Sequence, residues 1–210
     1  MKKLIPLLLV VLTFAACEKD PDTDKLDNKY LVYTNYDTKA DFKAFQTYYM
    51  PDSILIIGDK KEAEYWKDES AQEILQAYAT NMNNRGFVRV DDREEANLGL
   101  QVSYIKSTYY FNEYGRPEWW WNYPGYWDAP YWGNWGGWYY PYAVTYTYST
   151  GSFITELLNL EATQGEKEKL PILWTSYMSG LLSGSTAVNT KLAIEGVNQA
   201  YTQSSYLTNK

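Results

Sequence analysis

The sequence predicts an α+β fold: an antiparallel sheet with two amphipathic helices packed on it and a long insertion rich in Trp, Tyr, Gly and Pro. Several short segments alternate apolar and polar side chains, as half-buried strands do. Two longer segments repeat apolar side chains at helical spacing. Residues 109–148 follow neither pattern and are dominated by aromatic rings. Strands accompanied by two amphipathic helices indicate helices layered on one sheet.

The expected strands are marked by alternation. It is clearest at residues 98–104, where every second side chain would be buried. Segments 153–160 and 170–179 flank a polar turn around Gly165, so we expect an antiparallel hairpin there. Further strands are expected at residues 30–36, 45–50 and 87–90.

The first expected helix covers residues 70–84 and the second covers 186–201. In the first, Ser70 and Glu73 form a capping box, and Gly86 suits the left-handed residue after a helix end. An earlier start near Glu62, which would bury Trp66, stays open. The apolar positions that define the two helix faces are Ala71, Ile74, Leu75, Tyr78 and Met82, then Thr190, Ile194, Val197 and Tyr201.

The insertion at residues 109–148 holds 11 Tyr and 7 Trp, interrupted by four prolines. Because proline removes backbone donors, we expect an irregular excursion between two strands, with residues 142–148 returning to the sheet. Its rings could bury one another and cover the sheet, bind glycan through their faces, or contact a membrane surface. The candidate ligand-binding residues are Trp119, Trp120, Trp121, Trp127, Trp132, Trp135 and Trp138.

The N-terminus has the organisation of a secretory signal. Two lysines precede an apolar run at residues 4–14 that is too short to span a bilayer, and Pro6 interrupts it. The segment ends at Cys17, the only cysteine, so no internal disulfide can form. We expect a signal peptide at 1–16, a flexible tether at 17–29 and a single domain at 30–210. Cleavage as an ordinary signal peptide near Ala15 or Ala16, leaving a free thiol, is the alternative.

Composition disfavours several functions. Removing residues 1–16 takes away two lysines and leaves 17 basic against 26 acidic residues, a net charge near −9, which disfavours nucleic-acid binding. The chain has no histidine, so the usual acid/base group and the commonest metal ligand are absent. We therefore expect no cofactor, no metal site and no enzyme activity.

One acidic group deserves comparison with a glycosidase site, which needs two carboxylates facing each other across a cleft. Asp91, Asp92, Glu94 and Glu95 are too close together in sequence for that arrangement, and such runs usually form a solvated turn or a helix start. We expect such a solvated turn or helix start here, with no catalytic residues.

The segment Phe14-Ala15-Ala16-Cys17 resembles the lipobox of bacterial lipoproteins, with Phe14 in place of the usual Leu. The resemblance implies cleavage before Cys17 and acylation of it with lipid chains such as palmitate. The expected location is then the cell envelope, at the outer membrane, and the expected partners are the membrane and an envelope protein or glycan. Glu18-Lys19-Asp20 resembles surface-export signals of Bacteroidota lipoproteins, but a solvated linker explains it equally well, so the periplasmic and outer faces both stay open.

Short motifs in order along the chain resemble the envelope family known as domain of unknown function 4136. Glu156 and Asn159 stand where that family usually has Asp, as does Asn97. The family implies a lipid-anchored α+β domain and no assigned activity. We expect Trp174 to pack in the sheet rather than to contact a ligand. The motifs are Tyr36-Asp37, Asp41-Phe42, Thr47-Tyr48, Arg85-Gly86-Phe87, Ala96-Asn97-Leu98, Gly151 to Asn159 and Ile172-Leu173-Trp174.

Overall fold

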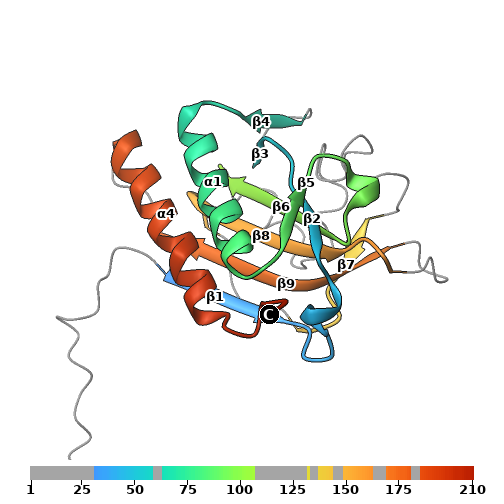
Figure 1. The fold of residues 1–210 in the computed structure, drawn as a ribbon. Helices are drawn as coiled ribbons and strands as arrows, with labels where there is room; N and C mark the ends of the chain where they lie inside the picture. Colours follow the sequence, from blue (N-terminus) through green and yellow to red (C-terminus); the bar gives the residue numbers. More distant parts are fainter. Residues whose placement is uncertain are drawn as a thin grey trace, which may run out of the picture.

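The computed structural model describes residues 31–58, 63–106, 132, 137–143, 149–162, 169–180 and 185–210. Two helices lie on one face of a mixed sheet, which confirms the predicted α+β class (Figure 1). The helices are α1 (Glu69–Asn84) and α4 (Thr186–Gln203). The strands are β1 (Leu31–Tyr36), β2 (Thr47–Tyr49), β3 (Ile54–Ile57), β4 (Glu64–Trp66), β5 (Val88–Val90), β6 (Leu98–Ile105), β7 (Trp138–Tyr139), β8 (Ser152–Asn159) and β9 (Leu170–Ser179).

The strand order along the sheet is β1-β9-β8-β6-β2-β5. The expected β8–β9 hairpin is present, and β8 also pairs antiparallel with β6. The sheet is not wholly antiparallel as the sequence predicted, because β2 runs parallel to both β5 and β6. The reason is the crossover through α1, which returns the chain to the sheet in the direction it left.

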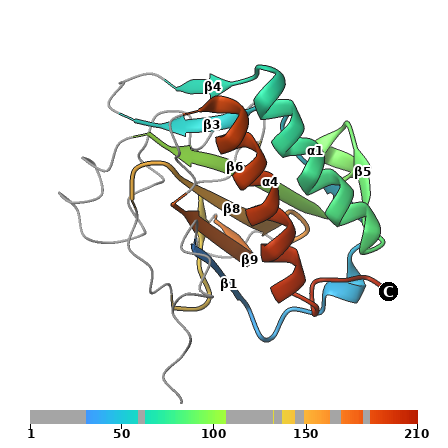
Figure 2. The same ribbon diagram turned by 90° about the vertical axis from the view of Figure 1, so that its left-hand side faces the viewer.

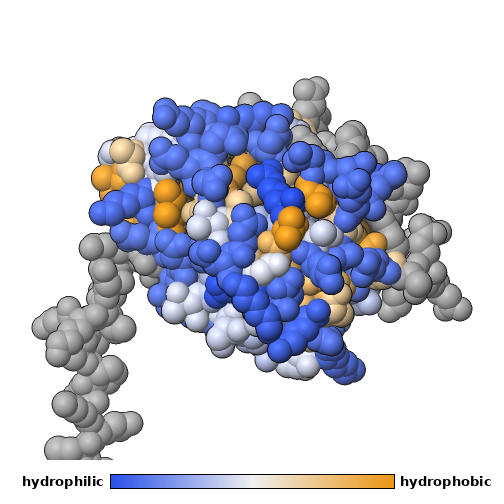
Figure 3. Space-filling model, in the orientation of Figure 1, coloured by the Kyte–Doolittle hydropathy of each residue, from blue (hydrophilic) through white to orange (hydrophobic). Residues whose placement is uncertain are grey.

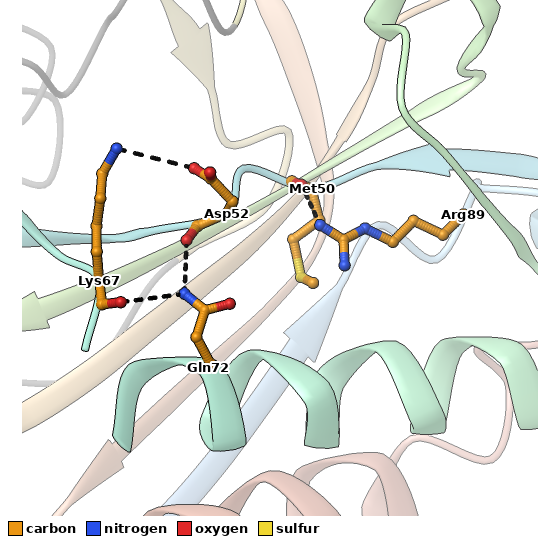
Figure 4. Close-up of polar contacts among 5 residues, drawn as sticks. All are labelled: Met50, Asp52, Lys67, Gln72 and Arg89. Carbon is orange, nitrogen blue, oxygen red and sulfur yellow. Dashed lines mark hydrogen bonds and ion pairs between the residues drawn. The ribbon is translucent and has the colours of Figure 1, made fainter. Parts of the chain in front are cut away.

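Strands β2 and β3 share one neighbour. The start of β6 pairs with β2 and its end pairs with β3. The extended backbone is therefore interrupted between β2 and β3. Figure 4 shows how that break is held: Arg89 donates to the carbonyl of Met50 at 2.9 Å. Gln72 of α1 donates to the carbonyl of Asp52 at 2.9 Å, and Lys67 lies 3.9 Å from the Asp52 carboxylate. These contacts fix the gap that separates the two short strands.

Helix α1 begins one residue before its predicted start, and the residue that caps it is not the predicted Ser70. The carboxylate of Asp68, rather than Ser70, accepts from the amide of Ala71 at 3.0 Å. The indole of Trp66 also donates to Asp68, at 2.6 Å, from a strand rather than from an extended helix. Gly86 follows the helix with φ of 95°, the left-handed conformation expected of it.

The main core lies between the two helices and the sheet. Figure 2 looks onto α1 and α4, with the sheet behind them. Trp174 is fully buried there and donates to the hydroxyl of Ser204 at 2.8 Å, as the predicted packing role requires. The phenol of Tyr78 on α1 bonds the hydroxyl of Thr155 on β8 at 2.5 Å. Helices and sheet are therefore joined by polar contacts inside an apolar core.

The surface seen from the direction of Figure 1 is mainly hydrophilic, with small separate apolar patches (Figure 3). Within the part of the chain that the structure describes, neither helix has the length and apolar character needed to cross a membrane.

Candidate functional site

A row of buried polar side chains crosses the centre of the sheet on the face opposite the helices. Gln101 of β6, Glu156 of β8 and Thr175 of β9 occupy directly paired positions on neighbouring strands. Paired residues project to the same face of a sheet, so the three side chains lie side by side. Their exposed fractions are 5%, 0% and 0%, so a carboxyl group is buried at the centre of this face.

Two aromatic residues of the insertion reach this row. The indole of Trp132 donates to the side-chain oxygen of Gln101 at 3.0 Å. The phenol of Tyr140 donates to the carboxylate of Glu156. Buried polar groups are costly unless they are bonded, so these contacts both stabilise the row and attach the insertion to the sheet.

A glycine makes room for the first of these contacts. A Cβ atom at Gly99 would lie 2.3 Å from Cζ3 of Trp132, so the indole rests directly on the β6 backbone. Trp132 also packs edge-on against Trp138, with ring centroids 6.2 Å apart, and edge-on against Tyr49 at 5.9 Å. Aromatic rings favour such edge-to-face geometry.

Two of the seven candidate tryptophans can therefore be placed. Trp132 is 1% exposed and Trp138 is 0% exposed, in a second core formed against the sheet. Neither presents a ring face to solvent, as a glycan platform would require. Cys17 and the other five candidates, Trp119, Trp120, Trp121, Trp127 and Trp135, lie outside the described residues.

Asn97, where the resembled family usually has Asp, holds two strands together. Its Oδ1 atom accepts from the amides of Gln46 and Thr47 at 2.8 and 2.9 Å. Its Nδ2 atom donates to the carboxylate of Glu161 at 2.6 Å. Both ends of the amide are used, so Asn97 has a structural role in this chain.

The acidic group at residues 91–95 forms the solvated turn that the sequence indicated. Asp92 accepts from the amide of Glu94 at 2.9 Å and caps a short 3-10 turn, Arg93–Glu95. A pocket of about 240 Å³ lies beside this turn. Within the described ranges, no group of three or more His, Cys, Asp or Glu side chains is placed to hold a metal ion. The pocket is lined by Arg93, Glu94, Glu95, Ala96, Asn97, Trp132, Leu160 and Glu161.

A second cleft, of about 330 Å³, opens on the helix side of the sheet, beneath the first turns of α4. Three aromatic rings in mutual contact form its wall: Tyr104 lies 5.7 Å from Trp66 and 5.1 Å from Phe153. The sequence analysis did not find this cleft. Its lining residues come from strands and helices far apart in the chain. The only local signal in the sequence is that a half-buried aromatic residue stands at or near the end of two strands, β4 and β6. The lining residues are Ile56, Trp66, Ile74, Tyr104, Lys106, Phe153, Thr186, Asn189 and Thr190.

Comparisons with known proteins agree with this fold. The model of the domain of unknown function family DUF4136 matches residues 32–204. A crystal structure of a DUF4136 family protein from Bacteroides thetaiotaomicron is 62% identical, with a TM-score of 0.80, and the match covers 88% of this chain and 100% of that one.

A PelC dodecamer from Paraburkholderia phytofirmans matches 81% of this chain and 96% of its own at 12% identity. Its TM-score of 0.36 is too low to support a conclusion about fold or function. No curated protein matches the sequence. The family model spans most of the described domain, and the Bacteroides relative covers nearly the whole chain, so this protein belongs to the DUF4136 family.

Proposed function

We propose that this chain is a non-catalytic lipoprotein of the cell envelope that is held at the outer membrane by acyl chains on Cys17 and acts by binding an envelope partner. The observation that carries the proposal is the position of the only cysteine. It follows an apolar run at residues 4–14 and precedes a polar tether, and the first strand begins at Leu31. Two or three acyl chains would hold such a domain firmly, because each buried methylene contributes about 0.8 kcal/mol.

Metabolic labelling tests the anchor. Cells grown with an alkyne analogue of palmitate should yield a labelled wild-type protein and an unlabelled Cys17→Ser protein. A matched Ser70→Ala variant should label like the wild type. Wild-type protein that carries no label would contradict the proposal.

The environment of the central carboxyl group supports a non-catalytic role. A catalytic carboxylate must reach its substrate, directly or through one water. Glu156 is fully buried and accepts a bond from Tyr140, and its neighbour Gln101 accepts from Trp132. These groups attach the insertion to the sheet and lie beneath its rings.

Glycan binding by the aromatic insertion is a second candidate. The observation in its favour is the pocket of about 240 Å³, whose lining includes Trp132, Arg93 and Glu161. The charged side chains of this lining can bond sugar hydroxyls, although Trp132, 1% exposed, offers no ring face to a sugar. Titration with cell-wall and capsular glycans tests it. Glycan binding would support this function if Glu94→Ala weakens it and Glu69→Ala on α1 leaves it unchanged. The absence of any glycan response would contradict it.

A further inference from the structure

The cleft beneath α4 differs from the other pocket in the chemistry of its walls. Ile74 and Phe153 form its interior and are 0% and 3% exposed, so both belong to the main core. Half-buried Ile56, Trp66 and Tyr104 form the wall above them. None of the two isoleucines and the phenylalanine offers a hydrogen bond. Sugar hydroxyls placed against these three side chains would therefore lose water without replacement, whereas a hydrocarbon chain would lose nothing there.

The volume of the cleft limits the size of its occupant. Ligand sites for small molecules begin at about 300 Å³, and this cleft has about 330 Å³. A water molecule takes about 30 Å³ in the liquid, and a methylene group is of similar size, so about ten such groups would fill the space. An alkyl chain of medium length fits this volume.

The mouth of the cleft is polar and carries a cation. Lys106 lines it with an ammonium group whose side chain is 57% exposed, and Glu64 lies 3.8 Å from that ammonium. Thr186 and Asn189 on the first turn of α4 complete the rim, and that turn holds no acidic residue. An anionic head group would meet Lys106 here in competition with the carboxylate of Glu64, and the first turn of α4 adds no further carboxylate.

We propose that this cleft binds a free medium-chain carboxylate, with its alkyl chain among Ile74, Phe153 and Trp66 and its head group at Lys106. None of the residues that line the cleft belongs to the aromatic insertion or to the lipid anchor, so the site does not depend on the function proposed above. It assigns a small-molecule ligand to the helix side of the sheet.

Calorimetric titration of the mature chain tests whether the cleft binds an alkyl chain. The chain carries Cys17→Ser, which removes the lipid anchor, so no detergent is needed. From hexanoate through octanoate to decanoate, affinity should rise about fourfold for each added methylene, then level off once the cleft is full. Affinity that does not change with chain length would overturn the proposal. This arm uses no substitution in the cleft and so does not depend on the folding of a variant.

A pair of variants on one helical turn tests the location. Thr186 lines the mouth, whereas Ala187 is exposed and lies outside the lining. Thr186→Trp should place an indole across the opening and weaken decanoate binding about fifteenfold, as if about two methylenes were no longer buried. Ala187→Trp should leave it within about twofold. Equal effects of the two variants would overturn the assignment to this cleft.

The head group is tested by charge. Lys106→Gln should weaken decanoate about threefold, the modest effect expected of a partly exposed ion pair, and should leave 1-decanol unchanged. Lys191→Gln, an exposed lysine elsewhere on α4, is the control. Equal affinity of the wild type for decanoate and decyltrimethylammonium, or equal effects of the two lysine variants, would overturn the carboxylate assignment.

Discussion

Gly99 shows how a single residue can decide the packing of the insertion. Because the ring of Trp132 occupies the space where a Cβ atom would lie, any side chain at Gly99 must push the ring away or bend β6. Trp132 is also held by its bond to Gln101, so it has little freedom to move.

We therefore predict that Gly99→Ala lowers the free energy of unfolding by about 1–3 kcal/mol, the usual cost of overpacking a core. Chemical denaturation measures the change. Gly58→Ala is the matched control, because a Cβ atom there would lie 3.6 Å from the Cβ of Lys106, an ordinary contact. Similar stabilities of the two variants would mean that the ring does not rest on Gly99.

Asn97 gives a second prediction at this scale. In Asn97→Asp the two backbone amides keep their acceptor, but a carboxylate replaces the amide nitrogen that faces Glu161. At neutral pH we expect a loss of about 1 kcal/mol from the lost donor and the like charges. The double variant Asn97→Asp with Glu161→Gln should recover most of the stability, because an amide again faces a carboxylate. Denaturation of the wild type and the two variants in parallel would show whether it does.

At the scale of elements, the end of α1 is held by the last residues of the chain. The backbone amide of Asn209 and the hydroxyl of Thr208 both donate to the carbonyl of Arg85, at 3.1 and 3.0 Å. Lys210 donates to the carbonyl of Asn84 at 2.7 Å. The carbonyls at a helix end lack partners within the helix, so the C-terminal segment supplies them.

Gly86 makes this arrangement testable by a double-mutant cycle. A Cβ atom at Gly86 would lie 2.0 Å from Oδ1 of Asn209, in addition to the strain of a positive φ. Gly86→Ala and removal of residues 208–210 should each cost about 1–2 kcal/mol. Together they should cost less than the sum, because removal of Asn209 relieves the clash. Additive costs would show that the two sites do not interact.

The elements that the sequence predicted are those with a strong local pattern. Both helices and strands β6, β8 and β9 were found within a few residues of their bounds, because each has a long amphipathic or alternating run, and the shorter strands β1, β2 and β5 were found as well. Strand β3 was missed because its four residues are all apolar and show no alternation. Strand β4 is three residues long and precedes the helix directly, so a helical extension that buries Trp66 fitted its sequence equally well.

At the scale of the whole molecule, the sheet separates two cores of different character. The helix side holds several buried tyrosines, and the other side holds the polar row under the insertion. The sequence could not show the second core, because Gln101, Glu156 and Thr175 become neighbours only through strand pairing. The aromatic cleft depends in the same way on six elements meeting at one place.

The buried tyrosines predict how stability changes with pH. Desolvation raises the pKa of Tyr48 to about 12 and also raises the pKa values of Tyr78 and Tyr201 above the usual value of 10.0. The folded chain thus keeps these protons to higher pH than the unfolded chain does. Their contribution to stability is full below pH 10 and is lost as pH rises toward 12.

Urea denaturation at pH 9, 10 and 11 measures this effect. The free energy of unfolding should fall with each step above pH 10, and the fall should be smaller in Tyr48→Phe, which has no proton to lose. Stability that stays constant from pH 9 to 11 would mean that the phenols are accessible to water in the folded protein.

Trp132 and Trp138 of the aromatic insertion pack on the second face of the sheet and are shielded from solvent. Fluorine NMR of protein labelled with 5-fluorotryptophan tests it directly, with Trp132→Phe and Trp138→Phe used to assign two of the resonances. Neither resonance should shift between H₂O and D₂O or broaden with a soluble paramagnetic agent. Solvent shifts and broadening of both resonances comparable to those of free 5-fluorotryptophan would contradict it.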